Sequence, residues 1–152
     1  MSESVRHAIV TTLRRVDGIG TVHDRQRYAV RKEDLRALYI DGQGVLKGWF
    51  VRFEARSETE EAIGRYRVVV RWGLYGFRGF DDGAESEKVF AALVEAVAAA
   101  FRADDTLGGV VLDTSAPGGA EQGLQVDQVE PVLFAGVLCH HARCRLTTRS
   151  LL

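Results

Sequence analysis

The chain has few of the residues that would place it in several common classes of protein. Its 152 residues include only two cysteines, Cys139 and Cys144, too few for a disulfide scaffold. No apolar stretch follows a basic start at the N-terminus, so no secretory signal and a reducing cytoplasm are expected. The sequence also lacks a run of about 20 strongly apolar residues, so no membrane span is expected. The formal net charge is only −1, so contact with nucleic acid would require uneven placement of charge.

Signatures of catalysis and of nucleotide binding are missing as well. There is no Gly-x-Ser-x-Gly nucleophile motif and no Gly-Lys-Ser/Thr phosphate loop. Gly18 and Gly20 lack the third glycine of a dinucleotide fingerprint and follow a predicted helix. His23 and Asp24 could act as a base and its orienting group, but no nucleophile motif accompanies them, and a structural role is favoured. We expect no enzyme activity and no cofactor.

A cluster of potential metal ligands lies near the C-terminus: Cys139, His140, His141 and Cys144. On a strand, Cys139 and His141 would point to one face, and His140 and Cys144 to the other. Side chains on opposite faces do not converge on one tetrahedral ion. We therefore expect neither a metal site nor a disulfide, but two packed and two surface side chains.

Periodicity predicts one α+β domain over residues 1–152, with a mixed or antiparallel sheet and two helices packed on one face. The first helix would be capped by Ser2 or Ser4 and run to about Val16. Two alternating strands would flank a hairpin tip at residues 57–61, and a capping box of Asp82 and Glu85, or else Ser86, would start the second helix. The other expected elements are an extended piece at residues 21–24, a helical turn at 32–38, a short strand at 110–113 and a final strand pair at 124–134 and 136–148. Pro131 indicates that the earlier strand of that pair is bent, bulged or at an edge.

The predicted helix over residues 86–103 is apolar nearly all the way round. One face carries large apolar side chains at helical spacing, and the rest is mostly alanine. A helix on the surface of a soluble domain normally shows a polar face, so this helix is expected to be covered on both sides. The second cover would come from another part of the chain or from another copy. We predict a contact between copies through the side that carries Ala91, Ala92, Ala96 and Ala99, or through the nearby strand edges.

The strands also predict an arginine-rich sheet face opposite the helices, opposed only by Glu54 among the strand residues. A solvated face and an assembly or lumen surface both explain it. Sequence-specific binding of nucleic acid is less favoured, because aromatic residues do not alternate with the arginines on that face. The arginines chosen for the assembly or lumen surface are Arg52, Arg67, Arg71, Arg143 and Arg145; the same predicted face holds Arg56, Arg65 and Arg149.

Four stretches resemble the lambda-type bacteriophage tail terminator family, also called tail completion or minor tail proteins. They are the first helix followed by Gly18-Ile19-Gly20-Thr21-Val22-His23-Asp24, the strand opening with Gly48-Trp49-Phe50 and its partner at residues 68–76, the helix end at residues 100–109, and the closing pair at 129–146. The resemblance covers nearly the whole chain, but it consists of an order of elements rather than a fingerprint.

The resemblance implies a structural virion protein that is assembled in the host cytoplasm and located in the phage tail. It implies a homo-oligomeric ring, typically of about six subunits. Such a ring caps the finished tail tube, contacts the tail tube protein and offers a surface to a head-completion or connector protein. The alternatives are a head–tail connector or neck protein, a small enzyme using His23 and Asp24, and a nucleic-acid-binding module using the arginines.

Overall fold

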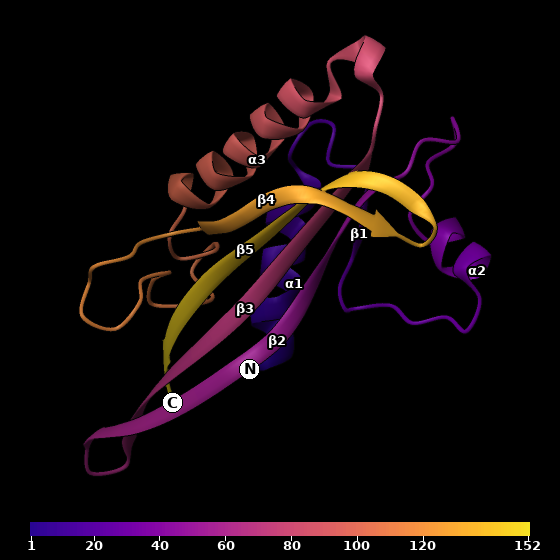
Figure 1. The fold of residues 1–152 in the computed structure, drawn as a ribbon. Coiled ribbons are helices and arrows are strands. Elements are labelled where there is room, and N and C mark those ends of the chain that lie inside the picture. Colours follow the sequence, from indigo (N-terminus) through magenta and orange to yellow (C-terminus); the bar gives the residue numbers. More distant parts are fainter.

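The computed structural model describes residues Met1–Leu152 and shows the predicted α+β fold (Figure 1). A five-stranded mixed sheet has the order β1-β2-β3-β5-β4, in which β1 is parallel to β2 and all other neighbours are antiparallel. In chain order the elements are α1 (Ser2–Arg14), β1 (Thr21–His23), α2 (Lys32–Ala37), β2 (Lys47–Ala62), β3 (Arg65–Gly79), the 3₁₀ turn η1 (Asp82–Ala84), α3 (Ser86–Ala103), β4 (Gln125–Phe134) and β5 (Val137–Leu151).

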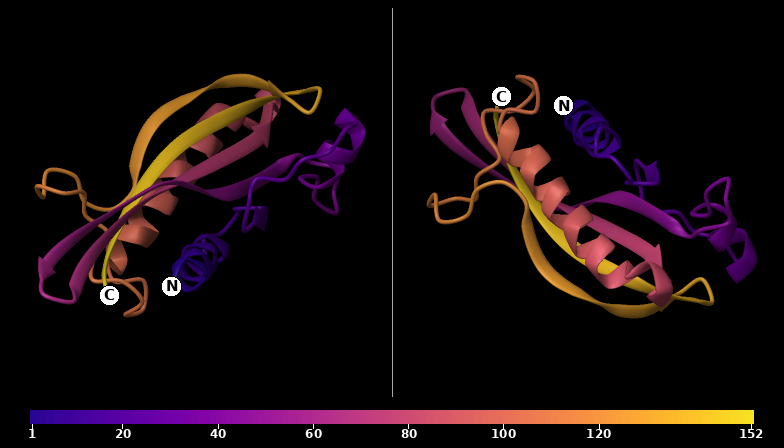
Figure 2. Two further views of the ribbon diagram at one scale, coloured as in Figure 1. Left: turned by 90° about the horizontal axis from the view of Figure 1, so that it is seen from below. Right: turned by 90° about the horizontal axis from the view of Figure 1, so that it is seen from above.

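Helices α1 and α3 pack side by side on one face of the sheet (Figure 2). The apolar stripe of α1 and the large side chains of α3 meet Trp49 and Trp72 of the central strands, and all of these side chains are buried. The indole N–H of Trp72 donates to Thr148 Oγ1 at 3.1 Å, so one deep polar group of this core is satisfied. This main core confirms the predicted two-helix layer.

The opposite sheet face differs from the prediction, because half of it is aromatic rather than cationic. Tyr39, Phe50 and Phe77 form a second buried cluster there with Leu46 and Cys139. The chain around α2 covers this cluster with Leu35 and Leu38. The cause is a change of residue type along each strand: Phe50 precedes Arg52 on β2, and Phe77 follows Arg71 on β3. Only the arginine half of this face is uncovered.

The β2–β3 hairpin is longer than predicted. Residues 57–61 are strand, and the turn lies at Ile63 and Gly64, where glycine accommodates a φ of +72°. The polar side chains before the turn indicate an exposed arm rather than a loop. A bulge between Phe53 and Ala55 places Arg56 opposite Val70, on the helix-bearing face, so the prediction that Arg56 belongs to the arginine face was wrong.

Several predicted element ends also need correction. Helix α1 begins after Met1 without a side-chain cap and ends at Arg14, two residues before the predicted end. The predicted capping box is absent; instead, Asp81 caps η1 by accepting from the Ala84 N–H. The predicted strand at residues 110–113 is reduced to an isolated bridge between Asp113 and Arg149.

The last strand pair follows its prediction. Strand β4 is an edge strand that pairs only with β5, and it carries a bulge between Val126 and Gln128. Pro131 therefore lies in an edge strand, where a missing N–H is tolerated.

Candidate functional surfaces

The alanine side of α3 is uncovered within the chain. Ala91, Ala92 and Ala96 are exposed, Ala99 is partly exposed, and the neighbouring Val89 is 42% exposed. The other side of the helix is fully used, since Phe90, Val97 and Phe101 are at most 1% exposed. The chain thus leaves open the surface for which the sequence predicted a second cover.

A second apolar surface lies on the helix-bearing side of the edge strand β4 and the start of β5, and the sequence analysis did not identify its residues. Val126, Val129, Leu133 and Leu138 are 41–66% exposed there. Alternation alone would have placed these side chains in the core, but α3 covers the central strands and leaves the edge strand open. Contiguous exposed apolar side chains are typical of interaction surfaces.

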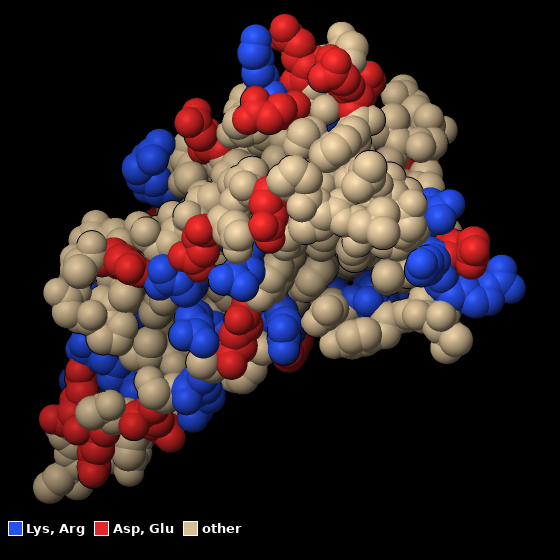
Figure 3. Space-filling model, viewed as in Figure 1, with Lys and Arg blue, Asp and Glu red and all other residues tan.

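Carboxylates of the same chain pair with three arginines of the arginine half of the sheet. Arg145 contacts Asp127 at 3.0 Å and Glu121 at 2.6 Å, Arg67 pairs with Glu61, and Arg149 pairs with Asp113. Basic and acidic atoms accordingly alternate over the strands and form no continuous basic field (Figure 3). The prediction that only Glu54 opposes these arginines was wrong, because the acidic partners come mainly from loops and the bulged edge strand.

Four arginines of this half make no ion pair: Arg52, Arg65, Arg71 and Arg143. Arg71 and Arg143 border a hollow of about 320 Å³ next to Arg145, Asp127 and Glu54. Hydrogen bonding from Arg145 holds the pKa of Asp127 below its usual value, with the burial of the carboxyl group opposing it. The acidic and basic side chains around the hollow therefore nearly cancel in charge. Such a mixed surface is better suited to contact with a protein than with a phosphate backbone.

Glu54 is itself held in place on this face. Its Oε1 accepts from the Tyr75 hydroxyl at 2.7 Å, and its side chain lies over Gly73, where a Cβ atom would collide with it. This contact fixes one carboxylate among the unpaired arginines.

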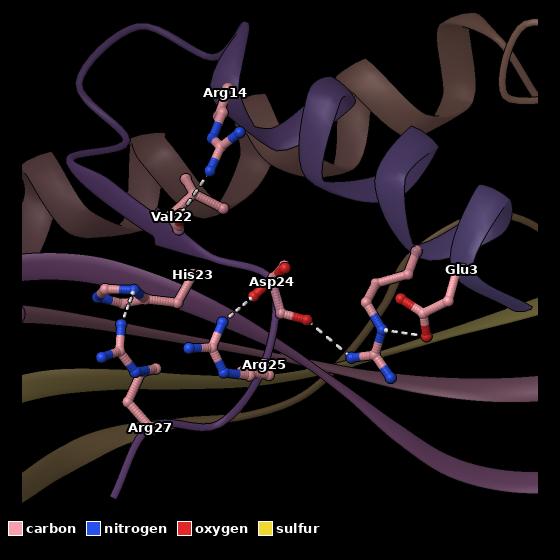
Figure 4. A network of polar contacts seen from close by, with 8 residues as sticks. Glu3, Arg14, Val22, His23, Asp24, Arg25 and Arg27 are labelled. Atoms are coloured by element: carbon pink, nitrogen blue, oxygen red, sulfur yellow. Dashed lines mark hydrogen bonds and ion pairs between the residues drawn. The ribbon is translucent and has the colours of Figure 1, made fainter. Parts of the chain in front are cut away.

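His23 and Asp24 do not form the pair that the enzyme alternative requires (Figure 4). His23 Nε2 lies 2.7 Å from the backbone oxygen of Leu38, and its Nδ1 lies 3.4 Å from Arg27. The Asp24 carboxylate instead accepts from Arg25 at 2.7 Å, which lowers its pKa. The two side chains have separate partners, as the favoured structural reading expects.

The Cys and His cluster is divided between the sheet faces, as alternation predicted. Cys139 is buried in the aromatic cluster, whereas Cys144 lies in the main core. Burial raises the pKa of the Cys139 thiol to about 11 and that of Cys144 to about 12, so both are protonated at neutral pH. The two thiols are free, and no group of three or more potential ligands converges anywhere in the chain.

A serine–histidine contact at the start of α3 was not foreseen from the sequence. Ser86 Oγ lies 2.9 Å from His140 Nε2 and accepts from the Asp81 N–H at 2.9 Å. Ser86 is only 4% exposed, and no carboxylate forms a hydrogen bond with His140. The contact ties the helix start to β5. Beside it lies a hollow of about 450 Å³ lined by Phe80, acidic side chains and His140.

The comparisons with known proteins add no family to these observations. No family model and no curated protein matches the chain. No helix of the structure combines the length and the hydropathy needed to cross a bilayer.

Proposed function

We propose that this chain is a structural virion protein that forms a ring on the end of a phage tail tube, stops tube elongation and offers the surface to which the head is joined. The observation that carries the proposal is the uncovered alanine side of α3. It coincides with the size and element order through which the sequence resembles tail terminators. The ring would assemble in the host cytoplasm and remain in the tail of the virion.

The physical basis of the ring is contact between copies rather than chemistry at a pocket. Alanine side chains lose little conformational entropy on burial and allow close backbone approach, which suits a flat contact. The β4 surface adds larger apolar groups near the same helix layer. A subunit contact that buries these surfaces would remove apolar area from water at about 25 cal/mol per Å².

The arginine half of the sheet is proposed as a contact surface for another virion protein. Its unpaired members, Arg52, Arg65, Arg71 and Arg143, supply charge without an internal partner. Arginine is favoured in such contacts because its planar head forms paired hydrogen bonds to carboxylates. In this proposal one rim contacts the tail tube protein and the other contacts a head-completion or connector protein.

The proposal is tested with a deletion mutant of the phage that carries this gene. Tail tubes and DNA-filled heads are isolated from that mutant, and the purified chain is added to each. We expect rings at tube ends in electron micrographs, tubes of fixed length, and restored joining of heads to tails. Binding to heads but not to tubes would support the role of a head–tail connector instead of a tail terminator. A chain that binds neither particle and stays monomeric would overturn the proposal.

A further inference from the structure

A basic loop between β1 and α2 exposes apolar side chains that the chain itself leaves uncovered. Residues 25–32 contain three arginines and one lysine and no carboxylate. Carboxylates at the two ends of the loop pair with two of these cations: Asp24 with Arg25, and Glu33 and Asp34 with Arg31. Arg27 and Lys32 make no ion pair. Tyr28 is 80% exposed and Val30 is fully exposed, although both lie in a protein with two buried aromatic and aliphatic cores. The Tyr28 hydroxyl donates to Oε1 of the neighbouring Gln26 at 3.1 Å. The loop therefore has the composition of a docking segment: cations around an exposed apolar centre.

A hollow of complementary character lies elsewhere on the same chain, beside the start of α3. It has a volume of about 450 Å³, and its wall includes Phe80, which is 46% exposed and packs on His140 with ring centroids 4.5 Å apart. The wall also includes three carboxylates, those of Asp82, Glu85 and Glu87. Residues 81–87 contain four carboxylates and no cation. This segment is therefore opposite in sign to the loop.

The two surfaces face different directions and do not meet within one chain. Acidic atoms gather around η1 and the start of α3 at the top of Figure 3, whereas basic atoms gather near α2 at its right edge. The carboxylates keep most of their charge for a partner, since the one cation that contacts the three lining the hollow is Lys88, 3.4 Å from Glu85. Lys88 in the wall of the hollow directly precedes Val89, where the uncovered face of α3 begins.

We infer that the loop at residues 25–32 of one copy docks into the acidic, Phe80-walled hollow of the next copy, forming a head-to-tail contact. The occupant is a second copy because the chain supplies both halves of the contact with matching charge and with apolar groups at both centres. Contacts between two different patches rotate each copy relative to the last and close into a ring when the rotation divides a full turn. The inference rests on the proposed self-assembly, and it names the segments that carry it.

The test uses reversed charges on each side of the contact in the full chain. One variant carries Arg25→Glu and Arg31→Glu, and the other carries Asp82→Lys and Glu87→Lys. All four side chains are exposed, and thermal melting controls for folding. Analytical ultracentrifugation should show that each variant alone needs at least about tenfold more protein to assemble than the wild type. An equimolar mixture should assemble again, because each contact in it joins opposite charges, and so should one chain carrying all four changes.

The outcomes separate this inference from the proposed function. Assembly of each single-sided variant at wild-type concentration would overturn the docking contact while leaving the ring in place. A monomeric wild type at all concentrations would overturn both. A gel shift with a short DNA duplex that the loop variant abolishes, together with no recovery of assembly in the mixture, would assign the loop to nucleic acid instead. Recovery in the mixture that weakens as salt increases would support the docking contact.

Discussion

At the scale of single residues, the packing of Trp49 depends on a glycine in the neighbouring strand. Trp49 and Gly76 are register partners, and the indole is completely buried. A Cβ atom at position 76 would lie 2.3 Å from the Trp49 ring, although the backbone angles there do not themselves require glycine. Gly76 therefore provides space for the largest side chain of the core.

Replacing Gly76 with alanine should destabilise the fold. The added methyl group would push the Trp49 ring into closely packed neighbours, and overpacking of this kind costs about 1–3 kcal/mol. Gly42→Ala is the matched control, because position 42 has open space and an ordinary φ. Urea unfolding followed by tryptophan fluorescence measures both variants, and equal stabilities of the two variants would contradict this account.

A partly buried histidine gives the fold a predictable response to pH. His141 stacks on Phe77 at 4.4 Å between ring centroids and approaches the backbone oxygen of Gly76 with Nδ1 at 3.0 Å. Burial lowers the pKa of His141, and the contact with Gly76 opposes part of that shift. The folded chain therefore favours the neutral ring, while the unfolded chain takes up a proton below about pH 6.5.

The free energy of unfolding should consequently fall as pH decreases from about 6.5 toward the lowered pKa of His141. His141→Phe keeps a stacked ring that does not titrate and should flatten this dependence. Burial also lowers the pKa of His140, so part of the slope should persist. Unfolding curves between about pH 5 and pH 7.5 provide the measurement, with the exposed His7→Gln as control. An unchanged slope in His141→Phe would exclude His141 as its source.

At the scale of elements, α3 shows two different surfaces with separate roles. Its large side chains hold the main core together, and its alanines face outward. Substitutions on the outer surface should therefore change assembly without weakening the fold. This separation is what distinguishes a contact surface from part of a core.

The double variant Ala92→Glu and Ala96→Glu should remain folded and lose assembly. Glutamate forms helices nearly as well as alanine, but two charges buried in a flat apolar contact would each cost several kcal/mol. Light scattering after size exclusion should show monomers, while circular dichroism and thermal melting stay close to those of the wild type. Ala120→Glu, an exposed alanine on a loop, is the control and should assemble normally. Normal assembly of the double variant would remove the alanine face from the subunit contact.

The elements with a strong period could be predicted from sequence, and those set by distant partners could not. The bounds of α3 agree at both ends because its apolar spacing continues from Ser86 to Ala103. The hairpin turn was misplaced because the exposed arm at residues 57–61 is as polar as a loop. The bulge after Phe53 has no local signal, and it reversed the expected side of Arg56.

The candidate surfaces could also be predicted only where a local pattern defines them, and not where they depend on residues distant in the sequence. Alanines on an apolar helix indicate an outer contact from local pattern alone, and those alanines are exposed. The neutralisation of Arg145 depends on Glu121 and Asp127, which no local pattern connects with it. The Ser86–His140 contact joins residues 54 positions apart and likewise needed the fold.

At the scale of the whole molecule, the proposed head-to-tail contact can lead either to an open filament or to a closed ring of defined size. The proposed contacts lie on different sides of the molecule, so each added copy exposes the same free patches as the last. An open arrangement would therefore grow without limit, whereas a closed ring uses every patch. A tail terminator has to stop growth along the tube, and this requires a closed ring with no free patch for a further copy.

Native mass spectrometry should accordingly show one dominant closed assembly next to the monomer, with few intermediates. The expected size from the resemblance to tail terminators is about six copies. The contact that closes the ring forms within one assembly, so incomplete rings are disfavoured relative to both the monomer and the complete ring. An equimolar mixture of the two charge-reversed variants is the control. Its two members must alternate around the ring, so only rings with an even number of copies can close. A continuous ladder of sizes that lengthens with concentration would indicate a filament and would contradict a capping role.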